Sequence, residues 1–499
     1  MTKAPGIATL GQLKKAGYKS RSVKDELRDN LIEALRNKRN VFSGIQGFED
    51  TVIPQIQTAI LSRHNIILLG LRGQAKTRIA RLMVNLLDEW IPYVAGSELN
   101  DDPFQPLSRY AIDLVSEKKD DTPIAWLHRE ERYGEKLATP DVTVADLIGD
   151  VDPIKAATLK LPYSDERVIH YGIIPRSNRG LFVINELPDL QARIQVSLFN
   201  ILQEGDIQIR GFRKRLPLDM QFVFTANPED YTNRGSIVTP LKDRIDSQIL
   251  THYPKSIDTA LRITEQEAKI SAAQQGVKVH DLLKELIEQV AFEARESDLV
   301  DKKSGVSARL TISALENLHS TAERRMLVNG ESGGWARVSD VFGIMPSITG
   351  KVELVYEGEV EGIANVARSL IGKAIRKIFL KRFPDPEKIK RGKGKTPNPY
   401  ATITGWFNDG NTVDILANAT QADYEKALIH VKGLKDIVRQ HQPSDDRCEQ
   451  ALFMEFALHG LSECSQLSVS TLSGNTQFKD LMGSVFNLDK FGEEEEDNN

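Results

Sequence analysis

The residues best suited to chemistry form a loop that directly follows an apolar stretch, Ile66–Leu69. The loop reads Gly70, Leu71, Arg72, Gly73, Gln74, Ala75, Lys76, Thr77 and Arg78. Glycines let the backbone turn tightly, so its N–H groups can converge on phosphate oxygens, and the start of a following helix adds positive charge. In such a loop Lys76 reaches the β- and γ-phosphates, and the Thr77 hydroxyl binds Mg²⁺. We therefore predict that residues 70–78 bind a nucleotide.

Ala75 departs from the phosphate-loop pattern G-x-x-x-x-G-K-[ST], in which this position is the second glycine. Alanine is the smallest possible change, but it adds a Cβ where the loop approaches the phosphates. The alternative interpretation is a strand–turn–helix segment in which the Lys-Thr pair is incidental.

A second apolar stretch, Leu181–Ile184, ends in two polar residues, Asn185 and Glu186. We predict that Glu186 polarises the attacking water. Asn185 stands where an aspartate usually supports Mg²⁺. Its side chain keeps an oxygen acceptor but lacks the negative charge that Mg²⁺ prefers, so the metal affinity is expected to fall. The alternative is a buried strand with an ordinary polar end.

Three further residues extend the candidate site. Asn227 follows the apolar stretch Phe222–Thr225 and could bind the γ-phosphate or position the water; the alternative is an Asn-Pro turn. Arg244 could reach the γ-phosphate in a neighbouring subunit, and by itself would be a surface arginine. Arg309 opens a helical stretch and could bridge two domains through the nucleotide.

The composition is that of an ordinary globular protein: 40% hydrophobic and 27% charged residues in a chain of 499. The net charge of −5 argues against a uniformly basic nucleic-acid binder. Cys448 and Cys464 form no C-x-x-C pair, which favours reduced thiols in a cytoplasmic protein. No apolar run approaches the ~18 residues of a membrane span, and the N-terminus has no apolar signal core.

Alternating apolar strands and helical stretches predict an α/β nucleotide-binding domain with a parallel sheet over residues 41–255. A helical arm is expected at 1–40, a helical lid domain at 256–345, and a mostly helical region at 346–485. The acidic end, 486–499, is predicted to be disordered.

Outside the nucleotide-binding domain the expectations are coarser. Helices are predicted at Ile257–Ala273, Val279–Glu296, Thr311–Val328, Ile363–Phe383, Ala422–Gln440 and Arg447–Glu463. Leu354–Gly362 begins like a strand. Pro384–Pro399 has lysines among prolines and glycines, which favours a mobile solvated loop over a contact with an anionic partner.

The order and spacing of these motifs resemble AAA+ ATPases of the helix-two-insert group, closest to the ATPase subunit of magnesium chelatase and the MoxR-type ATPases. The motifs are Gly70–Thr77, Leu181–Glu186, Thr225–Pro228, Pro240–Asp246 and Val306–Arg309. The resemblance covers about residues 41–330. It implies an AAA+ P-loop core with a helical lid, and a homo-oligomeric ring, usually a hexamer, with ATP and Mg²⁺ between subunits.

The resemblance also implies a role for each candidate. Lys76 and Thr77 match Walker A, Glu186 the catalytic glutamate, Asn227 sensor one, Arg244 the arginine finger and Arg309 sensor two. The segment Ile45-Gln46-Gly47 would lie near the adenine. Residues 141–179 match the helix-two insert and 205–218 the hairpin before sensor one. Members of the group commonly work with a von Willebrand factor A domain protein.

Three functions follow as hypotheses. The first is an ATP-driven motor, MoxR-like and chaperone-like, that remodels or activates a partner protein and hydrolyses ATP slowly. The second is a nucleotide-dependent switch or scaffold whose hydrolysis is weak because of Asn185. The third is a nucleic-acid motor or transcription activator, against which stands the lack of helix-turn-helix, zinc and Gly-Ala-Phe-Thr-Gly-Ala sequences.

Overall fold

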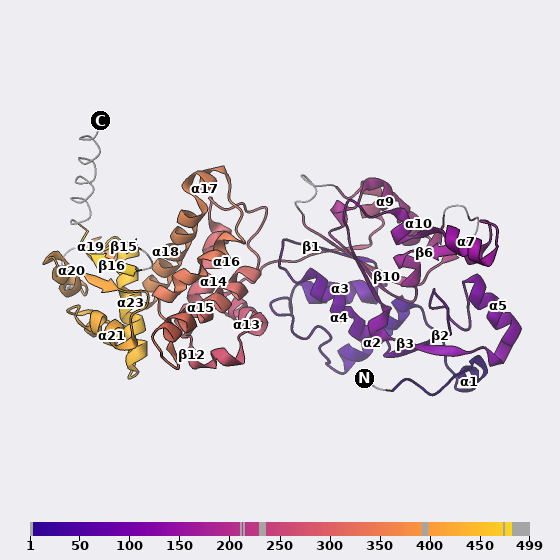
Figure 1. Cartoon of the computed structure of the whole chain (residues 1–499), viewed down its shortest axis with the longest axis horizontal. Coiled ribbons are helices and arrows are strands. Elements are labelled where there is room, and N and C mark those ends of the chain that lie inside the picture. Colours follow the sequence, from indigo (N-terminus) through magenta and orange to yellow (C-terminus); the bar gives the residue numbers. More distant parts are fainter. Residues whose placement is uncertain are drawn as a thin grey trace. The chain divides into compact units, whose positions relative to one another are not determined.

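The computed structural model of the chain describes residues 3–209, 212, 215–228, 236–391, 398–472 and 475–481. The chain divides into two compact units, Met1–Tyr253 and Pro254–Asn499 (Figure 1).

A five-stranded sheet forms the centre of the N-terminal unit. Its strands stand in the order β11 (Ser247–Leu250), β1 (Ile66–Leu69), β10 (Met220–Ala226), β7 (Gly180–Asn185) and β4 (Tyr133–Leu137). All four neighbouring pairs are parallel. Every residue of β1, β7 and β10 is buried, because helices cover both faces of a parallel sheet.

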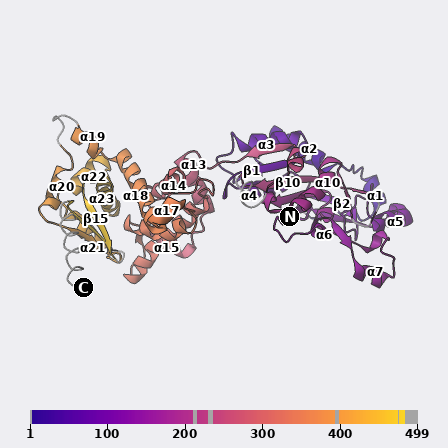
Figure 2. The ribbon, with the colours of Figure 1, turned by 90° about the horizontal axis from the view of Figure 1, so that it is seen from above.

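Alternate residues of each central strand enter different cores. Ile66 and Leu68 pack with α2 (Val23–Arg36), α3 (Val52–Leu61) and α4 (Lys76–Leu82). Ile67 and Leu69 enter a second core, which contains residues of α9 (Ala192–Ser197) and α10 (Phe199–Gln203). Figure 2 shows α2 and α3 on one side of β1 and β10. The predicted fold class, a P-loop α/β core with flanking helices, is confirmed.

The N-terminal helix α2 is an integral part of this unit. Its residues Val23, Leu27 and Leu31 are fully buried. Glu26, also buried, forms a bidentate ion pair with Arg132 at 2.7 and 2.6 Å. Removing one partner of such a buried pair strands the other charge, so the pair fixes how α2 packs on the sheet.

Asp219, directly before β10, ties the start of α2 to the sheet. Its two carboxylate oxygens accept hydrogen bonds from the Val23 N–H at 3.0 and 2.8 Å, and burial raises its pKa to about 6. Between pH 3.8, where the unfolded carboxyl titrates, and about 6, the folded unit holds a proton that the unfolded chain has released. We therefore expect the free energy of unfolding to fall as pH rises through this window, by at most ~3 kcal/mol.

Asp219→Asn is expected to flatten that pH dependence. Hydrogen exchange of the β1 and β10 amides between pH 4 and 7 measures the stability of this unit specifically. Glu33→Gln, on the exposed face of α2, is the control. An unchanged slope in the Asp219 variant would contradict the assignment.

Two smaller segments extend from the sheet. In the first, β2 (Trp90–Val94) and β3 (Ile124–His128) pair antiparallel and flank α5 (Arg109–Lys118). In the second, β5 (Gly149–Val151) pairs antiparallel with β6 (Ile169–Tyr171) around α7 (Pro153–Leu159). A hairpin of β8 (Asp206–Gln208) and β9 (Arg215–Pro217) precedes β10. Among the described residues this unit also contains the α-helices α1 (Leu10–Lys15), α6 (Val144–Leu147), α8 (Ile173–Arg176) and α12 (Thr239–Asp243).

The C-terminal unit is mainly helical, with one hydrophobic core that extends from Val277 to Phe478. Its longer helices are α13 (Ile257–Glu267), α14 (Asp281–Glu296), α15 (Arg309–Val328), α18 (Ile363–Arg382), α20 (Ala401–Asn408) and α23 (Arg447–Glu463). Two small sheets complete it, β12 (Val277–Lys278) with β13 (Gly334–Trp335), and β14 (Val413–Ile415) with β16 (Asn475–Lys479) and β15 (Ser468–Leu472).

Several predicted elements of this unit differ in the structure. Leu354–Gly362 contains a helix, α17 (Tyr356–Glu361), rather than a strand; glutamates in its first turn complement the helix dipole. Ala422–Gln440 is two helices, α21 (Gln421–Ile429) and α22 (Leu434–His441), because Gly433 adopts a left-handed conformation with φ 78°.

Two further predictions concern segments that lie partly or wholly outside the described residues. The predicted mobile loop Pro384–Pro399 begins with the helix α19 (Pro386–Arg391), and residues 392–397 lie outside the described residues. The predicted disordered tail, 486–499, also lies outside them. In the part of the chain that the structure covers, no helix has the length and apolar character needed to traverse a bilayer.

Candidate functional site

The candidate residues gather where the central strands end. Because β1, β7 and β10 run parallel, their carboxyl ends meet at one edge of the sheet, the usual position of ligand sites in such folds. The phosphate loop follows β1, Asn185 ends β7 and Asn227 follows β10. The sheet therefore brings together residues separated by more than a hundred positions in sequence.

Lys76, the first residue of α4, is buried within the loop. Its Nζ donates hydrogen bonds to the carbonyl oxygen of Gly70 and, at 3.2 Å, to that of Leu71. The ammonium group thus lies at the start of the loop, beside the helix N-terminus, where two sources of positive charge favour an anion.

Gly70 is required by close packing. A Cβ at this position would lie 1.8 Å from the Thr251 hydroxyl and 2.2 Å from the Gln74 side-chain oxygen. Those two side chains hydrogen-bond to each other at 2.6 Å, and both are buried. Thr251, just after β11, therefore clamps the loop against the sheet.

Ala75 adopts the left-handed conformation that the loop pattern assigns to glycine. Its φ is 56° and its ψ 17°, and it directly precedes α4. An L-residue pays about 1–2 kcal/mol for this conformation. The alanine therefore keeps the turn of the loop at the expense of some local strain.

Asn185 is the centre of a hydrogen-bond network. Its side-chain oxygen accepts hydrogen bonds from the Thr77 hydroxyl at 3.3 Å and the Thr225 hydroxyl at 3.0 Å. Its amide nitrogen donates to Oε1 of Glu135 on the neighbouring strand β4. The network joins the end of the phosphate loop to three strands of the sheet.

Glu186 and Asn227 follow their strands at the same edge. Glu186 has a left-handed backbone, with φ 53° and ψ 51°, and its N–H donates to the Thr225 hydroxyl at 3.2 Å. This conformation turns the chain sharply out of β7, and the side chain is half-buried. Asn227 is almost fully buried.

Arg244 lies at the opposite edge of the sheet. It precedes β11, and Asp246 two residues later accepts a hydrogen bond at 2.8 Å from the N–H of Asn65, the residue before β1. The guanidinium donates to Gln203 at 3.0 Å and stacks over Phe199 at 4.8 Å. The phosphate loop follows β1 at its far end, so the sheet separates Arg244 from the loop of its own chain.

The remaining candidates are placed as follows. Gly47 has a φ of 81°, and Ile45 is buried in the core beside α3. Phe48 follows Gly47, and its ring centroid lies 5.0 Å from that of His252. His252 directly follows Thr251, the residue that clamps the loop. Arg309 is exposed and begins α15 in the C-terminal unit, whereas the loop belongs to the N-terminal unit.

Sequence reasoning missed Glu135, Thr225 and Thr251 as site residues. Each meets the loop or Asn185 only through strand pairing. Only Thr225 lies in one of the motifs, Thr225–Pro228, and sequence reasoning assigned it no role there. Glu135 stands on a strand of intermediate burial that no apolar run marks. Only the position of β4 beside β7 reveals it.

The side chains at this edge suit a hard cation. Oxygen donors from Thr77, Asn185 and Glu135 lie within one hydrogen-bonded network, and Mg²⁺ prefers such ligands together with nucleotide phosphates. Among the described residues no group of three or more His, Cys, Asp or Glu side chains could hold a metal on its own. The donor set therefore fits Mg²⁺ carried by a nucleotide.

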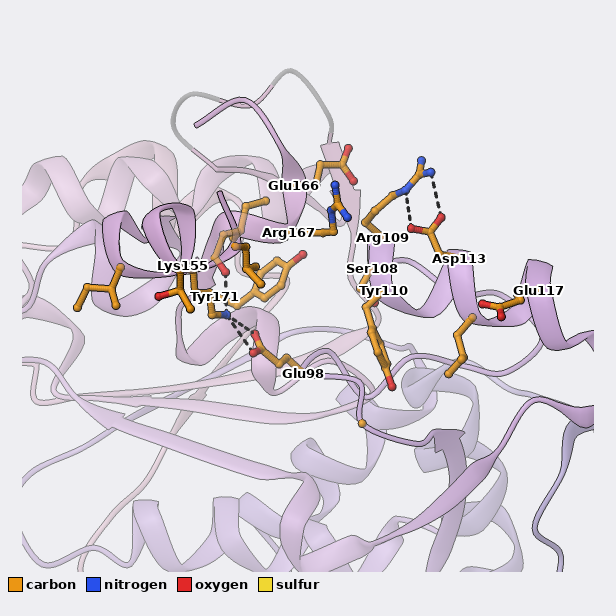
Figure 3. Close-up of a pocket in the computed structure, with 16 residues that line it drawn as sticks. Glu98, Ser108, Arg109, Tyr110, Asp113, Glu117, Lys155, Glu166, Arg167 and Tyr171 are labelled. Atoms are coloured by element: carbon orange, nitrogen blue, oxygen red, sulfur yellow. Dashed lines mark hydrogen bonds and ion pairs between the residues drawn. The ribbon is translucent and has the colours of Figure 1, made fainter. Parts of the chain in front are cut away.

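A cavity of about 610 Å³ lies elsewhere in this unit, between α5 and the β5–α7–β6 segment (Figure 3). Four of its charged side chains form two ion pairs, Arg109 with Asp113 at 2.9 Å and Lys155 with Glu98 at 3.1 Å. The apolar lining comes from Leu114, Ile154, Leu159 and Ile169. The cavity thus combines ion-paired side chains with apolar surface.

Comparisons with known proteins agree with the family resemblance of the sequence motifs. Residues 162–248 match the sigma-54 interaction domain family. The magnesium-chelatase 38 kDa subunit of Cereibacter sphaeroides is 26% identical over 237 residues, which are 46% of this chain and 63% of that protein. The corresponding subunit of Rhodobacter capsulatus is 24% identical over 226 residues, 44% of this chain and 59% of that protein. The chain thus spans about three-fifths of the length of these relatives.

Among solved structures, a putative ATPase from Cytophaga hutchinsonii is 17% identical and covers 73% of this chain and 98% of its own. Its TM-score is 0.29, a likeness too weak to add to the assignment. The family assignment therefore depends on the sequence matches and on the hydrogen-bond network at the strand ends.

Proposed function

Because the N-terminal unit is an AAA+ ATPase domain of the magnesium-chelatase and MoxR-like type, we propose that it binds ATP with Mg²⁺ and hydrolyses it in a homo-oligomeric, hexameric ring. The observation that carries this proposal is the convergence of Lys76, Thr77 and Asn185 at one edge of the sheet. These groups supply phosphate binding and metal support in one place.

Each side chain has a distinct part in the reaction. Lys76 binds the β- and γ-phosphates, and backbone N–H groups of residues 70–78 surround them. Bound Mg²⁺ would neutralise charge on these phosphates. Glu186 orients and polarises the attacking water, and Asn227 positions the γ-phosphate or the water. The hydrolysis is slow because the Asn185 side chain itself places no charge beside the Thr77 hydroxyl.

Arg244 acts on the nucleotide of a neighbouring subunit. Its place at the amino ends of the strands, opposite the phosphate loop, supports action between chains. A planar guanidinium suits the charge that develops on the γ-phosphate. Arg309 would reach the nucleotide from the C-terminal unit.

The work of the ring is the remodelling or activation of a partner protein in the cytoplasm, with a von Willebrand factor A domain protein as the candidate partner. The β5–α7–β6 segment and the β8–β9 hairpin are the proposed client-contacting elements. Exposed apolar side chains on α7, Ile154 at 77% and Leu159 at 52%, support a protein client.

Two alternatives remain as competing functions. A nucleotide-dependent switch with weak hydrolysis is favoured by Asn185. A nucleic-acid or transcription motor is favoured by the match to the sigma-54 interaction domain. The chain has no Gly-Ala-Phe-Thr-Gly-Ala sequence and a net charge of −5, which support the protein-remodelling motor instead.

Mixing two inactive variants tests the motor and its ring together. Arg244→Ala retains Glu186, and Glu186→Gln retains Arg244, so each alone is expected to lose most Mg²⁺-ATP turnover. In randomly mixed rings about a quarter of the head-to-tail interfaces combine both intact residues, and turnover should recover to about that fraction. Phosphate release from an equimolar mixture, assembled without nucleotide, provides the measurement.

Lys242→Ala removes an exposed cation on α12, two residues before Arg244; it is the matched control and should keep native turnover. Mixtures that stay inactive, although gel filtration shows co-assembly, would refute action between chains. Native protein that binds ATP without turnover would favour the switch.

A further inference from the structure

Glu135, on the strand beside Asn185, carries the negative charge that the Asn185 side chain lacks. Asn185 ends β7, and Glu135 lies on the adjacent parallel strand β4, whose Leu137 stands opposite Asn185. The Asn185 amide nitrogen donates to Oε1 of Glu135. A full negative charge thus lies one hydrogen bond from the position that the usual aspartate occupies.

Glu135 is held in this position from its other side. The Tyr133 hydroxyl donates to Oε2 of Glu135 at 3.0 Å, and the Arg81 guanidinium lies 4.0 Å from the same oxygen. The Glu135 side chain is 30% exposed, which leaves its carboxylate within reach of water.

We propose that Glu135 supplies the negative charge of the magnesium site, and that Asn185 connects it to Thr77. In the usual arrangement one aspartate both accepts the hydrogen bond of the phosphate-loop hydroxyl and carries the charge. Here the Asn185 oxygen accepts from Thr77, and the charge stands on β4. The hydrogen bond from Asn185 to Glu135 polarises the amide and makes its oxygen a stronger acceptor.

This division predicts that Asn185 and Glu135 depend on each other. Asn185→Asp alone would remove the donor to Glu135 and place two carboxylates side by side, where like charges disfavour joint ionisation. Glu135→Gln alone would remove the charge and keep an acceptor for Asn185. The exchange of both, Asn185→Asp with Glu135→Gln, returns one charge and one amide to the pair.

The test is Mg²⁺ binding, independent of turnover. The affinity of ADP is measured by calorimetry in EDTA and then across a Mg²⁺ titration, with Mn²⁺ binding followed by electron paramagnetic resonance. Glu135→Gln is expected to weaken the metal affinity of the nucleotide complex by about 10- to 100-fold, as loss of supporting carboxylates does elsewhere. Metal-free ADP binding should stay unchanged, and the double exchange should recover most of the metal affinity.

Glu130→Gln, an exposed carboxylate just before β4, is the charge-matched control. An unchanged Mg²⁺ dependence in Glu135→Gln, or a double exchange no better than Glu135→Gln, would overturn the inference. The inference rests on the proposed nucleotide site. Failure of the native protein to bind ADP in EDTA or in Mg²⁺ would overturn that function itself, a result distinct from a change confined to the metal.

Discussion

Glu186→Gln is expected to reduce ATP turnover by about 10²- to 10⁴-fold, the usual contribution of a positioned general base. ATP affinity should stay within a few-fold of the native value. Glutamine keeps the size of the side chain and an acceptor oxygen, but it cannot take a proton. The left-handed backbone of Glu186 turns the chain at the edge where the phosphate loop ends, and Thr225 fixes its N–H at 3.2 Å.

Steady-state phosphate release and the binding of a fluorescent ATP analogue measure the two quantities separately. Asp189→Asn is the matched control, because Asp189 is the next carboxylate in the chain and is also half-buried. An equal loss in both variants would indicate a general electrostatic effect. Native turnover in Glu186→Gln would show that another group activates the water.

The parts of the site that sequence could predict are those encoded by neighbouring residues. The phosphate loop joins an apolar strand to Lys76 within a few positions, and the strand before Asn185 is a continuous apolar run. Parallel sheets covered on both faces produce such runs, so β1, β7 and β10 could be located before their neighbours were known.

The parts that sequence could not predict depend on which strands pair. Glu135 and Asn185 are 50 positions apart and meet because β4 lies beside β7. Likewise β14 pairs with β16 more than sixty residues later, so the place of β14 in the small antiparallel sheet of the C-terminal unit has no local signature. Residues 430–433 separate α21 from α22, and the turn ends at the left-handed Gly433, which apolar periodicity does not detect.

The hydrogen bond to Glu135 also changes how an asparagine at position 185 is interpreted. Considered alone, an asparagine in this place indicates a weakened metal site. Hydrogen-bonded to Glu135, it becomes one half of a pair whose charge stands on the neighbouring strand. The two interpretations predict opposite results for Asn185→Asp: improved Mg²⁺ binding if the site merely lacks a charge, and no improvement if Glu135 already supplies it.

Lys76→Ala is expected to weaken ATP binding by about 10²-fold and to abolish measurable turnover. Hydrogen bonds to charged groups contribute about 1.5–3 kcal/mol each, and the ammonium would contact two phosphates. In the structure its Nζ already lies at the Gly70 and Leu71 carbonyl oxygens, inside the loop. ATP titration by calorimetry, with and without Mg²⁺, measures the loss.

Two further variants separate phosphate binding from loop stability. Arg72→Ala removes an exposed cation of the same loop and should change ATP affinity only a few-fold. Thr77→Ala should lose the Mg²⁺-dependent part of the affinity and keep the metal-free part, because its hydroxyl serves the metal and Asn185. If Lys76→Ala binds ATP as tightly as the native protein while its melting temperature is unchanged, the loop does not hold phosphate, and the nucleotide site must lie elsewhere.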